Sequence, residues 1–469
     1  MPEHISPGIY IEEISSQPAP IKSVATAIPA FIGYTQKAQL KESGDLLNVP
    51  FRIASVHEYE YYFGIADFEK GIEITFEKDG NNVVAVGTIN QNTSSHYLVY
   101  YWLQLFFMNG GSACYITSVG AYSEEGIIKT ADLKTGLEAV KRIDEITLLL
   151  FPDSVNVATY QEYYSIYEEA MKQCAELQDR FTIFTVFHSN NDISVWKNDA
   201  ALLRSSLDLD AKYLQYAAAY FPRLYTSIQF ITTDELVKVV SNGVGDLPGT
   251  LAELKLVNSA FYELGVNAIR QIEMRLPASA AVAGVYANTD NTKGVWKAPA
   301  NVNIDAAIRP EYVLTQQEQE ELNDEQSQGK YINVIRTFTG KGPAIIWGAR
   351  TLAGNDNEWK YISVRRYFNM VGESCREAIE PFIFEPNNNN TWSSIKILIE
   401  NYLFQQWQAG ALMGTKPEQA YFVKVGLGIT MTQNDVDNGN LIVEIGMAVI
   451  KPAEFIILRL KAQMFIDKK

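Results

Sequence analysis

Four histidines and a few aspartates are the side chains of this chain that could serve nucleophilic catalysis. His188 and Asp153 each follow an apolar run that predicts a buried strand, so they can be drawn as the base and the orienting acid of a serine-hydrolase triad. The nucleophile is missing from this pattern. In GTLAEL, at 249–254, Leu251 stands where the serine of a nucleophile turn would be needed, and the chain has no GxSxG motif. We therefore predict no catalytic residue and a structural role for His188.

Three glycine- or aspartate-rich stretches were candidates for phosphate or metal sites. GKGP, at 340–343, lacks the spacer and the hydroxyl of a P-loop, and Pro248 interrupts GVGDLPG, at 243–249. In DVDNG, at 435–439, glycine is fifth and Gly446 is twelfth, whereas a calcium loop needs glycine sixth and glutamate twelfth. The sequence predicts turns in all three places, with no metal and no cofactor.

The three cysteines, Cys114, Cys174 and Cys375, are widely spaced in apolar surroundings and form no CxxC pair. They predict reduced thiols inside a protein made in a cytosol, and they argue against a zinc site. The first thirteen residues lack the basic and apolar segments of a signal peptide. The longest apolar run, Tyr97–Met108, is too short to span a membrane, so we expect a buried helix there.

Charge is distributed unevenly along the chain. The net charge is −16, whereas residues 361–469 carry eleven basic and eleven acidic side chains. An acidic body argues against nucleic-acid binding, which requires cations that neutralise phosphates. The acidity either serves solubility or marks a part that faces solvent while the neutral part packs against other subunits. The sequence leaves both explanations open.

Strand and helix patterns alternate between residues 130 and 240, which predicts a mostly parallel sheet covered by helices. The apolar runs Ile28–Tyr34, Ile146–Phe151 and Phe181–Phe187 predict buried strands. We expect helices over Tyr160–Leu177 and Asp210–Tyr220.

An inserted hairpin is expected at about 64–97, with strands Ile72–Phe76 and Val83–Ile89 around an Asp-Gly-Asn turn. Two further strands, Tyr331–Phe338 and Ala344–Ala349, should lead into the last part of the chain.

The last hundred residues carry the strongest helix signal. Gly410 is placed to end a helix that Asn390 or Thr391 could cap. An earlier helix is expected over Val364–Phe382. Five large apolar residues recur at three- and four-residue spacing on one face of the later helix: Trp392, Ile395, Ile399, Leu403 and Trp407.

Strands are expected after these helices over Tyr421–Val425, Leu441–Ile450 and Phe455–Leu460, with a turn at Asp435–Asn440. Near the other end of the chain, Gly8–Ile14 also alternates as a short strand. The first and last of the chain's strands have no local partner, and an unpaired strand edge is ready to pair with another chain.

Several motifs, in order, resemble those of contractile tail sheath proteins from myophages and phage-tail-like injection systems. The C-terminal hundred residues carry FEPNNNNTW, QQWQAGALMG, TQNDVDNG and VIKPAEFIILRL. Two earlier blocks are also similar to this family: SPGIYIEEISSQPAPIKSVATAIPAFIGYT near the start and LPASAAVAGVYANTDNTKGVWKAPANV at 276–302.

The resemblance implies an α/β fold. Its central domain would be a parallel-sheet domain that is subtilisin-like but not catalytic, and an α+β sheath domain would follow it. Extended N- and C-terminal strands would be exchanged between protomers. We expect an extension and linker over 1–22, the central domain over 23–358 and the sheath domain over 359–469, facing an inner tube.

The resemblance also implies a mechanical function without catalysis. Protomers would assemble into a helical homo-oligomer around an inner tube protein, with baseplate and terminator or cap proteins at its ends, and contraction would drive the tube through a cell envelope. The protein would be made in the bacterial cytoplasm and would work in an assembled particle, without nucleic acid or membrane insertion. The alternatives are a serine hydrolase that uses the subtilisin-like domain and a static structural tube protein.

Two sets of residues follow as candidate contact sites. The tube-facing set lies on the polar side of the later helix: Lys396, Glu400, Asn401, Gln405 and Gln408. The inter-protomer strands comprise Gly8, Ile9, Tyr10, Ile11 and Glu12 at one end and Phe455, Ile456, Ile457, Leu458 and Arg459 at the other.

Overall fold

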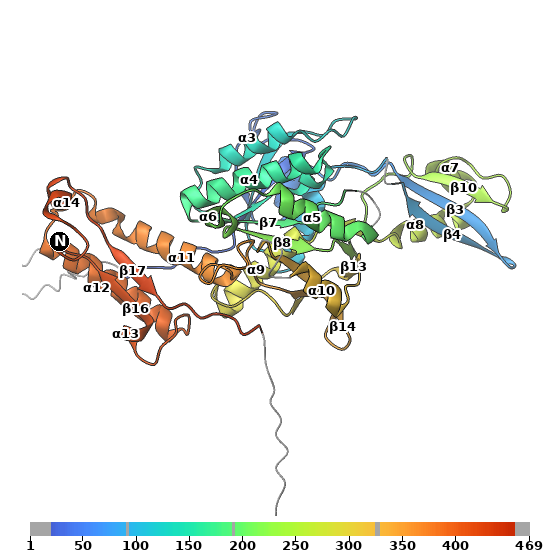
Figure 1. The fold of residues 1–469 in the computed structure, drawn as a ribbon. Helices are drawn as coiled ribbons and strands as arrows, with labels where there is room; N and C mark the ends of the chain where they lie inside the picture. Colours follow the sequence, from blue (N-terminus) through green and yellow to red (C-terminus); the bar gives the residue numbers. More distant parts are fainter. Residues whose placement is uncertain (1–19, 91–92, 190–192, 324–328, 455–469) are drawn as a thin grey trace, which may run out of the picture. The chain divides into compact units, whose positions relative to one another are not determined.

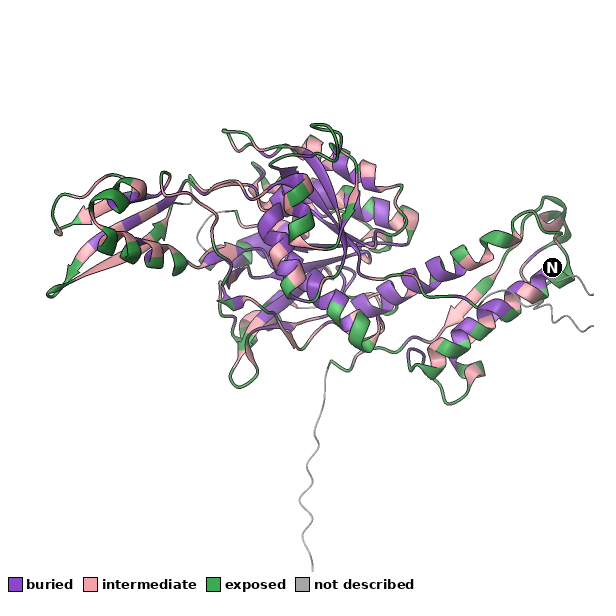
Figure 2. Cartoon of the chain, turned by 180° about the vertical axis from the view of Figure 1, so that it is seen from behind, coloured by how far each residue is buried: buried purple, intermediate pink, exposed green. Residues whose placement is uncertain are grey.

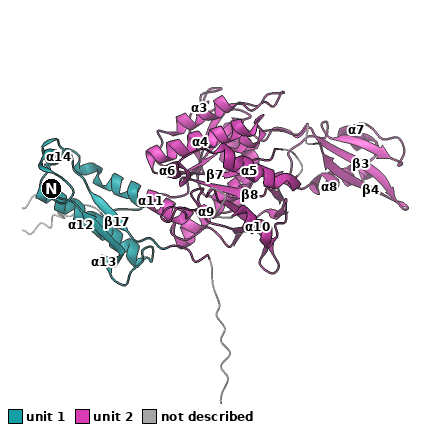
Figure 3. Ribbon diagram, viewed as in Figure 1, with its two compact units in different colours: residues 1–24, 371–450 teal, residues 25–370, 451–469 magenta. Residues whose placement is uncertain are grey.

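A computed structural model describes residues 20–90, 93–189, 193–323 and 329–454. Within this part, contacts divide the chain into two compact units, which we describe separately (Figure 3). Unit 1 comprises residues 20–24 and 371–450, and unit 2 comprises residues 25–370 and 451–454. The division falls inside one helix, α11 (Ile362–Ile379). The domain boundaries expected from the sequence remain predictions, because contacts alone do not test independent folding.

Unit 2 is built around a nine-stranded mixed sheet (Figure 1). Six central strands are parallel, and β2, β12 and β15 join antiparallel at the two edges. In spatial order the strands are β12 (Val302–Asn303), β15 (Gly342–Trp347), β14 (Ile332–Phe338), β8 (Ala217–Phe221), β7 (Phe181–Thr185), β6 (Leu148–Leu150), β1 (Pro29–Thr35), β5 (Cys114–Ala121) and β2 (Phe51–Ile53). The predicted mixed α/β class with a large, mostly parallel sheet is confirmed.

Helices cover both faces of this sheet, which explains why its strands are apolar on both sides (Figure 2). Alternate residues of one strand enter different cores, as a two-residue period requires. Phe31 packs in one core with the helices α2 and α9, while Ala30 and Ile32 pack in the other with α3, α4 and α5. These helices are α2 (Val99–Met108), α3 (Thr130–Val140), α4 (Tyr160–Leu177), α5 (Trp196–Ser206) and α9 (Ser279–Lys293).

The helix expected over Asp210–Tyr220 is wrong for most of its length. The structure has only one helical turn, α6 (Ala211–Leu214), before the chain enters strand β8. Ala217–Ala219 are fully buried, with β7 and β14 on either side of β8. The alanines favour a helix intrinsically, but their place in the middle of the sheet outweighs that weak preference.

The expected hairpin is present as β3 (Ile72–Asp79) and β4 (Asn82–Ile89), while its being an insertion stays a prediction. The sequence did not indicate that it belongs to a larger lobe, in which β10 (Lys238–Asn242) pairs parallel to β3. Two helices, α7 (Leu251–Val257) and α8 (Ser259–Arg270), complete a separate small core with these strands. A smaller sheet elsewhere in unit 2 consists of β11 (Met274–Leu276), β9 (Leu224–Thr226) and β13 (Ala307–Pro310).

Unit 1 contains the helix α12 (Asn389–Gln408) and the antiparallel pair β16 (Tyr421–Lys424) and β17 (Glu444–Met447). Four residues of the expected apolar face of α12 are buried, whereas Trp407 is half-buried. The expected N-cap is wrong by two or three residues, because Asn388 accepts hydrogen bonds from the N–H groups of Asn390 and Thr391. Gly410, at φ +84°, follows the last helical turn as expected.

Two further expectations for unit 1 need correction. The helix expected over Val364–Phe382 ends at Ile379 and continues as the 3-10 turn η3 (Glu380–Phe382). The stretch expected as a turn at Asp435–Asn440 begins inside the short helix α14 (Gln433–Asp437). That helix forms because Thr432 and Asp435 make a capping box, which the sequence analysis overlooked.

The three cysteines are buried free thiols, as predicted. Burial raises the pKa of the Cys375 thiol to about 12, so it stays protonated. Among the described residues, no helix is both long and apolar enough to cross a lipid bilayer.

Candidate functional site

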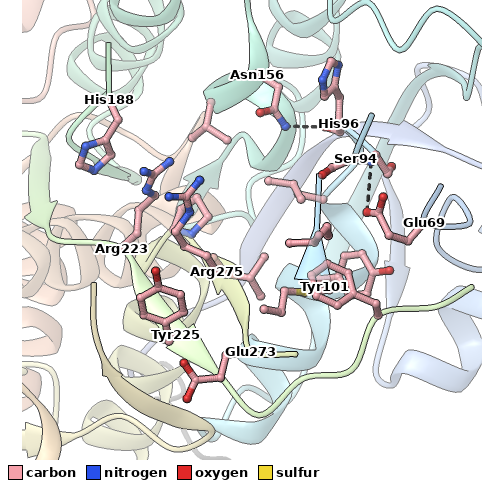
Figure 4. A pocket seen from close by; sticks show the side chains of 18 residues that line it. Glu69, Ser94, His96, Tyr101, Asn156, His188, Arg223, Tyr225, Glu273 and Arg275 are labelled. Atoms are coloured by element: carbon pink, nitrogen blue, oxygen red, sulfur yellow. Dashed lines mark hydrogen bonds between the residues drawn. The ribbon is translucent and has the colours of Figure 1, made fainter. Parts of the chain in front are cut away.

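His188, the candidate catalytic base, lies at a cavity of about 430 Å³ beyond the carboxyl end of β7 (Figure 4). Its side chain is almost completely buried, and its Nδ1 lies 3.2 Å from Oδ2 of Asp199. Burial lowers the pKa of His188, which favours the neutral imidazole. The sequence analysis considered Asp153 as the partner of His188 and missed Asp199, which lies on α5.

The hydroxyl nearest to this pair is not arranged as a nucleophile. Ser189 Oγ donates a 2.6 Å hydrogen bond to Oδ1 of Asp199, whereas a triad requires the serine to donate to the histidine. Near His188, the guanidinium groups of Arg223 and Arg275 lie side by side (Figure 4). Both donate to the buried carboxylate of Glu311, at 2.7–3.0 Å. Ser189, Arg223 and Arg275 are therefore each bonded to a buried carboxylate, whereas Nε2 of His188 has no hydrogen-bond partner among the described residues.

Asp153 lies where a flavodoxin-like sheet usually binds its ligand. The six parallel strands have the order β5-β1-β6-β7-β8-β14, so the switch point lies between β1 and β6. There the carboxylate of Asp153 accepts hydrogen bonds from the backbone N–H groups of Tyr34 and Leu98, at 2.7 and 2.6 Å. Asp153 is fully buried, and this burial raises its pKa to about 7 despite those donors. The switch point is thus occupied by the protein's own side chain.

The three stretches considered as phosphate or metal sites form loops and a helix cap in the structure. GKGP forms the turn between β14 and β15, where Gly340 has φ +80°. GVGDLPG lies between β10 and α7, with Gly243 at φ +75°. In DVDNG, Asp435 accepts hydrogen bonds from the backbone and hydroxyl of Thr432, so it is used as a helix cap.

The five residues predicted to face a tube all lie on α12. Lys396 and Glu400 form an i,i+4 pair, with Nζ and Oε1 3.8 Å apart and both side chains about half exposed. Asn401, Gln405 and Gln408 are exposed and line a groove along the same helix. The structure thus brings the set together on one exposed side of one helix.

The groove beside α12, which we call the α12 groove, has a volume of about 580 Å³. Its apolar wall comprises Pro20, Ile21, Ile397, Leu398, Tyr402 and Phe404, and its rim comprises Ser394, Asn401, Gln405 and Gln408. Ile397 and Phe404 are 54% and 38% exposed, which is unusual for large apolar residues in the middle of a helix. Segment 20–24 is held beside this helix because Ser23 Oγ and Tyr402 Oη form a 2.9 Å hydrogen bond.

The sheet of unit 1 is small. Among the described residues β16 and β17 pair only with each other, so each strand has one edge without a strand neighbour. A two-stranded sheet is marginally stable alone, and a free edge can template a further strand. The two predicted inter-protomer strands, at 8–14 and 455–460, lie outside the described residues.

Comparisons with known proteins all find sheath proteins, and together they cover nearly the whole chain. Residues 354–463 match the family model of the phage tail sheath C-terminal domain. The chain is 28% identical to the anti-feeding prophage helical sheath in its contracted state, with a TM-score of 0.66, covering 97% of this chain and 98% of that one. A second structure, of the sheath complex of the extracellular contractile injection system PVC in its contracted state, is also 28% identical, with a TM-score of 0.65 and 98% of both chains covered. The chain is therefore similar to contractile sheath proteins over nearly its whole length, and residues 354–463 match their C-terminal domain family.

Part of the chain is also similar to curated phage proteins. It is 29% identical over 130 residues to the tail sheath protein of Enterobacteria phage T4, and 29% identical over 131 residues to that of Vibrio phage KVP40. These alignments cover 27% of this chain and 19% of each phage protein, so the chain matches about a fifth of the length of these curated relatives.

Sequence reasoning missed an exposed aromatic residue of unit 1. Phe384, in the turn between η3 and α12, is fully exposed and has φ +72°. It belongs to FEPNNNNTW, the motif on which the resemblance partly rested. The apolar run Phe382–Phe384, between Pro381 and Pro386 and shortly before four asparagines, was the signal that could have drawn attention to it.

Proposed function

We propose that this chain is the protomer of a contractile tail sheath. It assembles into a helical tube around an inner tube protein, and contraction drives that inner tube through a target cell envelope. The observation that carries the proposal is the near-complete match to the anti-feeding prophage helical sheath in its contracted state. A match to a baseplate structure of the same system, at 29% identity and a TM-score of 0.64, supports attachment to a baseplate.

The proposal also includes the surroundings that the resemblance to sheath proteins implies. The protomer is made in the bacterial cytoplasm and works in an assembled phage tail or extracellular injection particle, with a terminator or cap protein at the far end. Its central domain has a subtilisin-like fold without catalysis, and its terminal strands are exchanged between neighbours. The hydrolase alternative is tested by a fluorophosphonate label, and covalent labelling of any serine would support it.

We expect the purified protein to assemble into hollow tubes without nucleotide, because neighbouring subunits complete the free edges of unit 1. Negative-stain electron microscopy across concentrations up to tens of micromolar is the measurement. Protein that stays monomeric over this range would overturn the proposed function. Tubes of a single fixed length and diameter under acid or denaturant stress would instead support a static tube.

The exposed side of α12 meets the inner tube in this proposal. The double variant Lys396→Glu, Glu400→Lys should capture less inner tube while empty sheaths still form. The intrahelical pair survives this exchange, since Glu before Lys at i,i+4 is the favoured order, so the helix itself stays stable. Only the charge pattern that the helix presents to a partner is reversed.

Co-purification of the inner tube protein with the sheath, and the fraction of filled particles in micrographs, measure this effect. A matched control exchanges Glu169 and Lys172 on α4, which form a similar exposed pair at 3.1 Å. Normal filling of the α12 variant, or equal loss in the α4 variant, would contradict the assignment of α12 to the tube.

A further inference from the structure

One turn of unit 1 exposes two apolar side chains together. Phe384 is fully exposed, at 102% of its reference area, and Ile383 is 60% exposed. They lie between η3 and α12, and the turn is closed by backbone hydrogen bonds from Ile383 N to Glu380 O and from Glu385 N to Phe382 O, at 3.0 and 3.1 Å. Two exposed apolar neighbours on a closed turn form a projection, which we call the Phe384 spike.

The backbone of the spike is strained as well as exposed. Phe384 has φ +72°, in the left-handed region where a bulky residue is a genuine outlier and where glycine or asparagine would fit without strain. Neither the strain nor the exposure stabilises the isolated chain. Strained residues of this kind gather at functional surfaces, where a partner offsets their cost.

A complementary surface exists on the same unit. The apolar lining of the α12 groove includes Ile21, Ile397 and Phe404, and its volume of about 580 Å³ lies within the range of sites that hold bulky apolar groups. Among the described residues, its lining contains no carboxylate. This matters because Glu380 and Glu385 flank the spike, and an acidic groove would repel them.

We propose that the Phe384 spike of one protomer inserts into the α12 groove of a neighbouring copy. Of the predicted tube-facing set, only Lys396 and Glu400, which do not line this groove, would then be left to meet the inner tube. The spike cannot fill its own groove, because Phe384 is fully exposed in the structure. A projection and a groove on different surfaces of one molecule make a heterologous contact, and such contacts continue into open helical assemblies when they do not close into a ring. The inference rests on the proposed function and assigns one contact of the sheath lattice.

The contact is small, because two side chains bury far less area than a stable dimer requires. It should therefore be occupied only within an assembly, where many contacts act together. Accordingly, the spike should matter for the concentration at which tubes form and not for the folding of the protomer.

Phe384→Asn separates these two effects, since asparagine tolerates positive φ. We expect an unchanged or higher melting temperature and at least a tenfold higher critical concentration for tubes. Phe384→Leu keeps an apolar spike and should assemble at concentrations closer to those of the wild type. Leu256→Ala removes a side chain that is 88% exposed on α7 and serves as the matched control, with no expected effect. Normal assembly of Phe384→Asn, or equal losses in Leu256→Ala, would overturn the proposal.

Cross-linking identifies the occupant of the groove. The native cysteines are buried, so Phe384→Cys and Ile397→Cys introduce accessible thiols. Oxidation with copper phenanthroline during assembly should give covalent dimers only in a mixture of the two single variants, and a ladder of oligomers in the double variant. Dimers of Phe384→Cys alone would show a symmetric contact and overturn the proposal. So would a Phe384→Asn variant that forms empty sheaths normally but loses the inner tube, because the occupant would then be the tube.

Failure of this inference can be distinguished from failure of the proposed function. If the wild-type chain forms tubes and Phe384→Asn does so equally well, the sheath function stands and the spike contact is wrong. If the wild-type chain forms no tubes at all, the proposed function is wrong, and the spike contact, which rests on it, is wrong with it.

Discussion

Deletion of residues 1–14, or of residues 455–469, should leave unit 2 folded and abolish the assembly of full sheaths. Unit 2 has its own sheet and two large cores, all within the described residues. The sheet of unit 1 has only β16 and β17, and Phe422 on β16 is 45% exposed. Strands supplied by neighbours would complete that sheet, and removal of the donors leaves only smaller side-chain contacts, such as that of the Phe384 spike, to join the protomers. We expect the critical concentration to rise more than tenfold.

The structure sets where the C-terminal deletion must begin. The carboxylate of Glu454 accepts hydrogen bonds from the guanidinium of Arg350 within unit 2, with Nε–O distances of 3.0 and 3.1 Å. A deletion that also removed Glu454 would leave Arg350 without this partner and could weaken folding for an unrelated reason. Circular dichroism and thermal unfolding of the dilute protein check that the truncated chains fold, and electron microscopy measures assembly.

A point variant keeps the chain length constant. Ile9→Pro with Ile11→Pro removes two backbone N–H donors from the predicted strand, whereas Ile9→Val with Ile11→Val keeps both donors and the preference for a strand. The proline pair should fail to assemble, and the valine pair should behave as wild type. Insertion of a few flexible residues near Gln17 should be milder and should give sheaths locked in the extended state. If either truncation still builds contractile sheaths, strand exchange is wrong for this protein.

The parallel sheet and its covering helices could be predicted because continuous apolar runs and helical periodicity are local signals. Helix α4 begins and ends where expected, and β1, β6 and β7 lie within one residue of the expected stretches or inside them. Strand β8 was missed because burial between β7 and β14, which no local pattern records, overrides the helix preference of Ala217–Ala219. Likewise, β10 pairs with β3 across more than 160 residues, so the hairpin alone could not indicate the lobe.

Among the candidate sites, too, local sequence patterns could be read and features that depend on tertiary packing could not. The exposed side of α12 follows from helical spacing, so Lys396 and Glu400 could be placed together from sequence. The partner of His188 could not be identified, since Asp199 reaches it only through the packing of α5. Phe384 was missed because its exposure and its positive φ are properties of a folded turn and not of residue type.

The buried pair of Arg366 and Asp290 should produce the largest loss of stability of any single substitution tested in unit 2. Arg366 lies on α11 and Asp290 on α9, and both side chains are less than 5% exposed. Arg366 Nη1 donates to Asp290 at 3.1 Å, and its Nη2 donates to the carbonyl oxygen of Thr26 at 2.7 Å. The Thr26 hydroxyl donates to the same carboxylate, at 2.6 Å. The pair therefore ties the segment before β1 to two helices.

Arg366→Ala or Asp290→Ala alone should lower the free energy of unfolding by about 3–5 kcal/mol, because each leaves a buried charge without its partner. The double variant should lose clearly less than the sum of the two single losses, since it leaves no charge unpaired. Lys172→Ala breaks an exposed pair on α4 and should stay within about 1 kcal/mol of wild type. Urea denaturation of the unassembled protein measures the free energy of unfolding of the four variants and of the wild type. Additive losses, or single losses as small as that of Lys172→Ala, would mean that water reaches this pair and that packing alone joins α9 to α11.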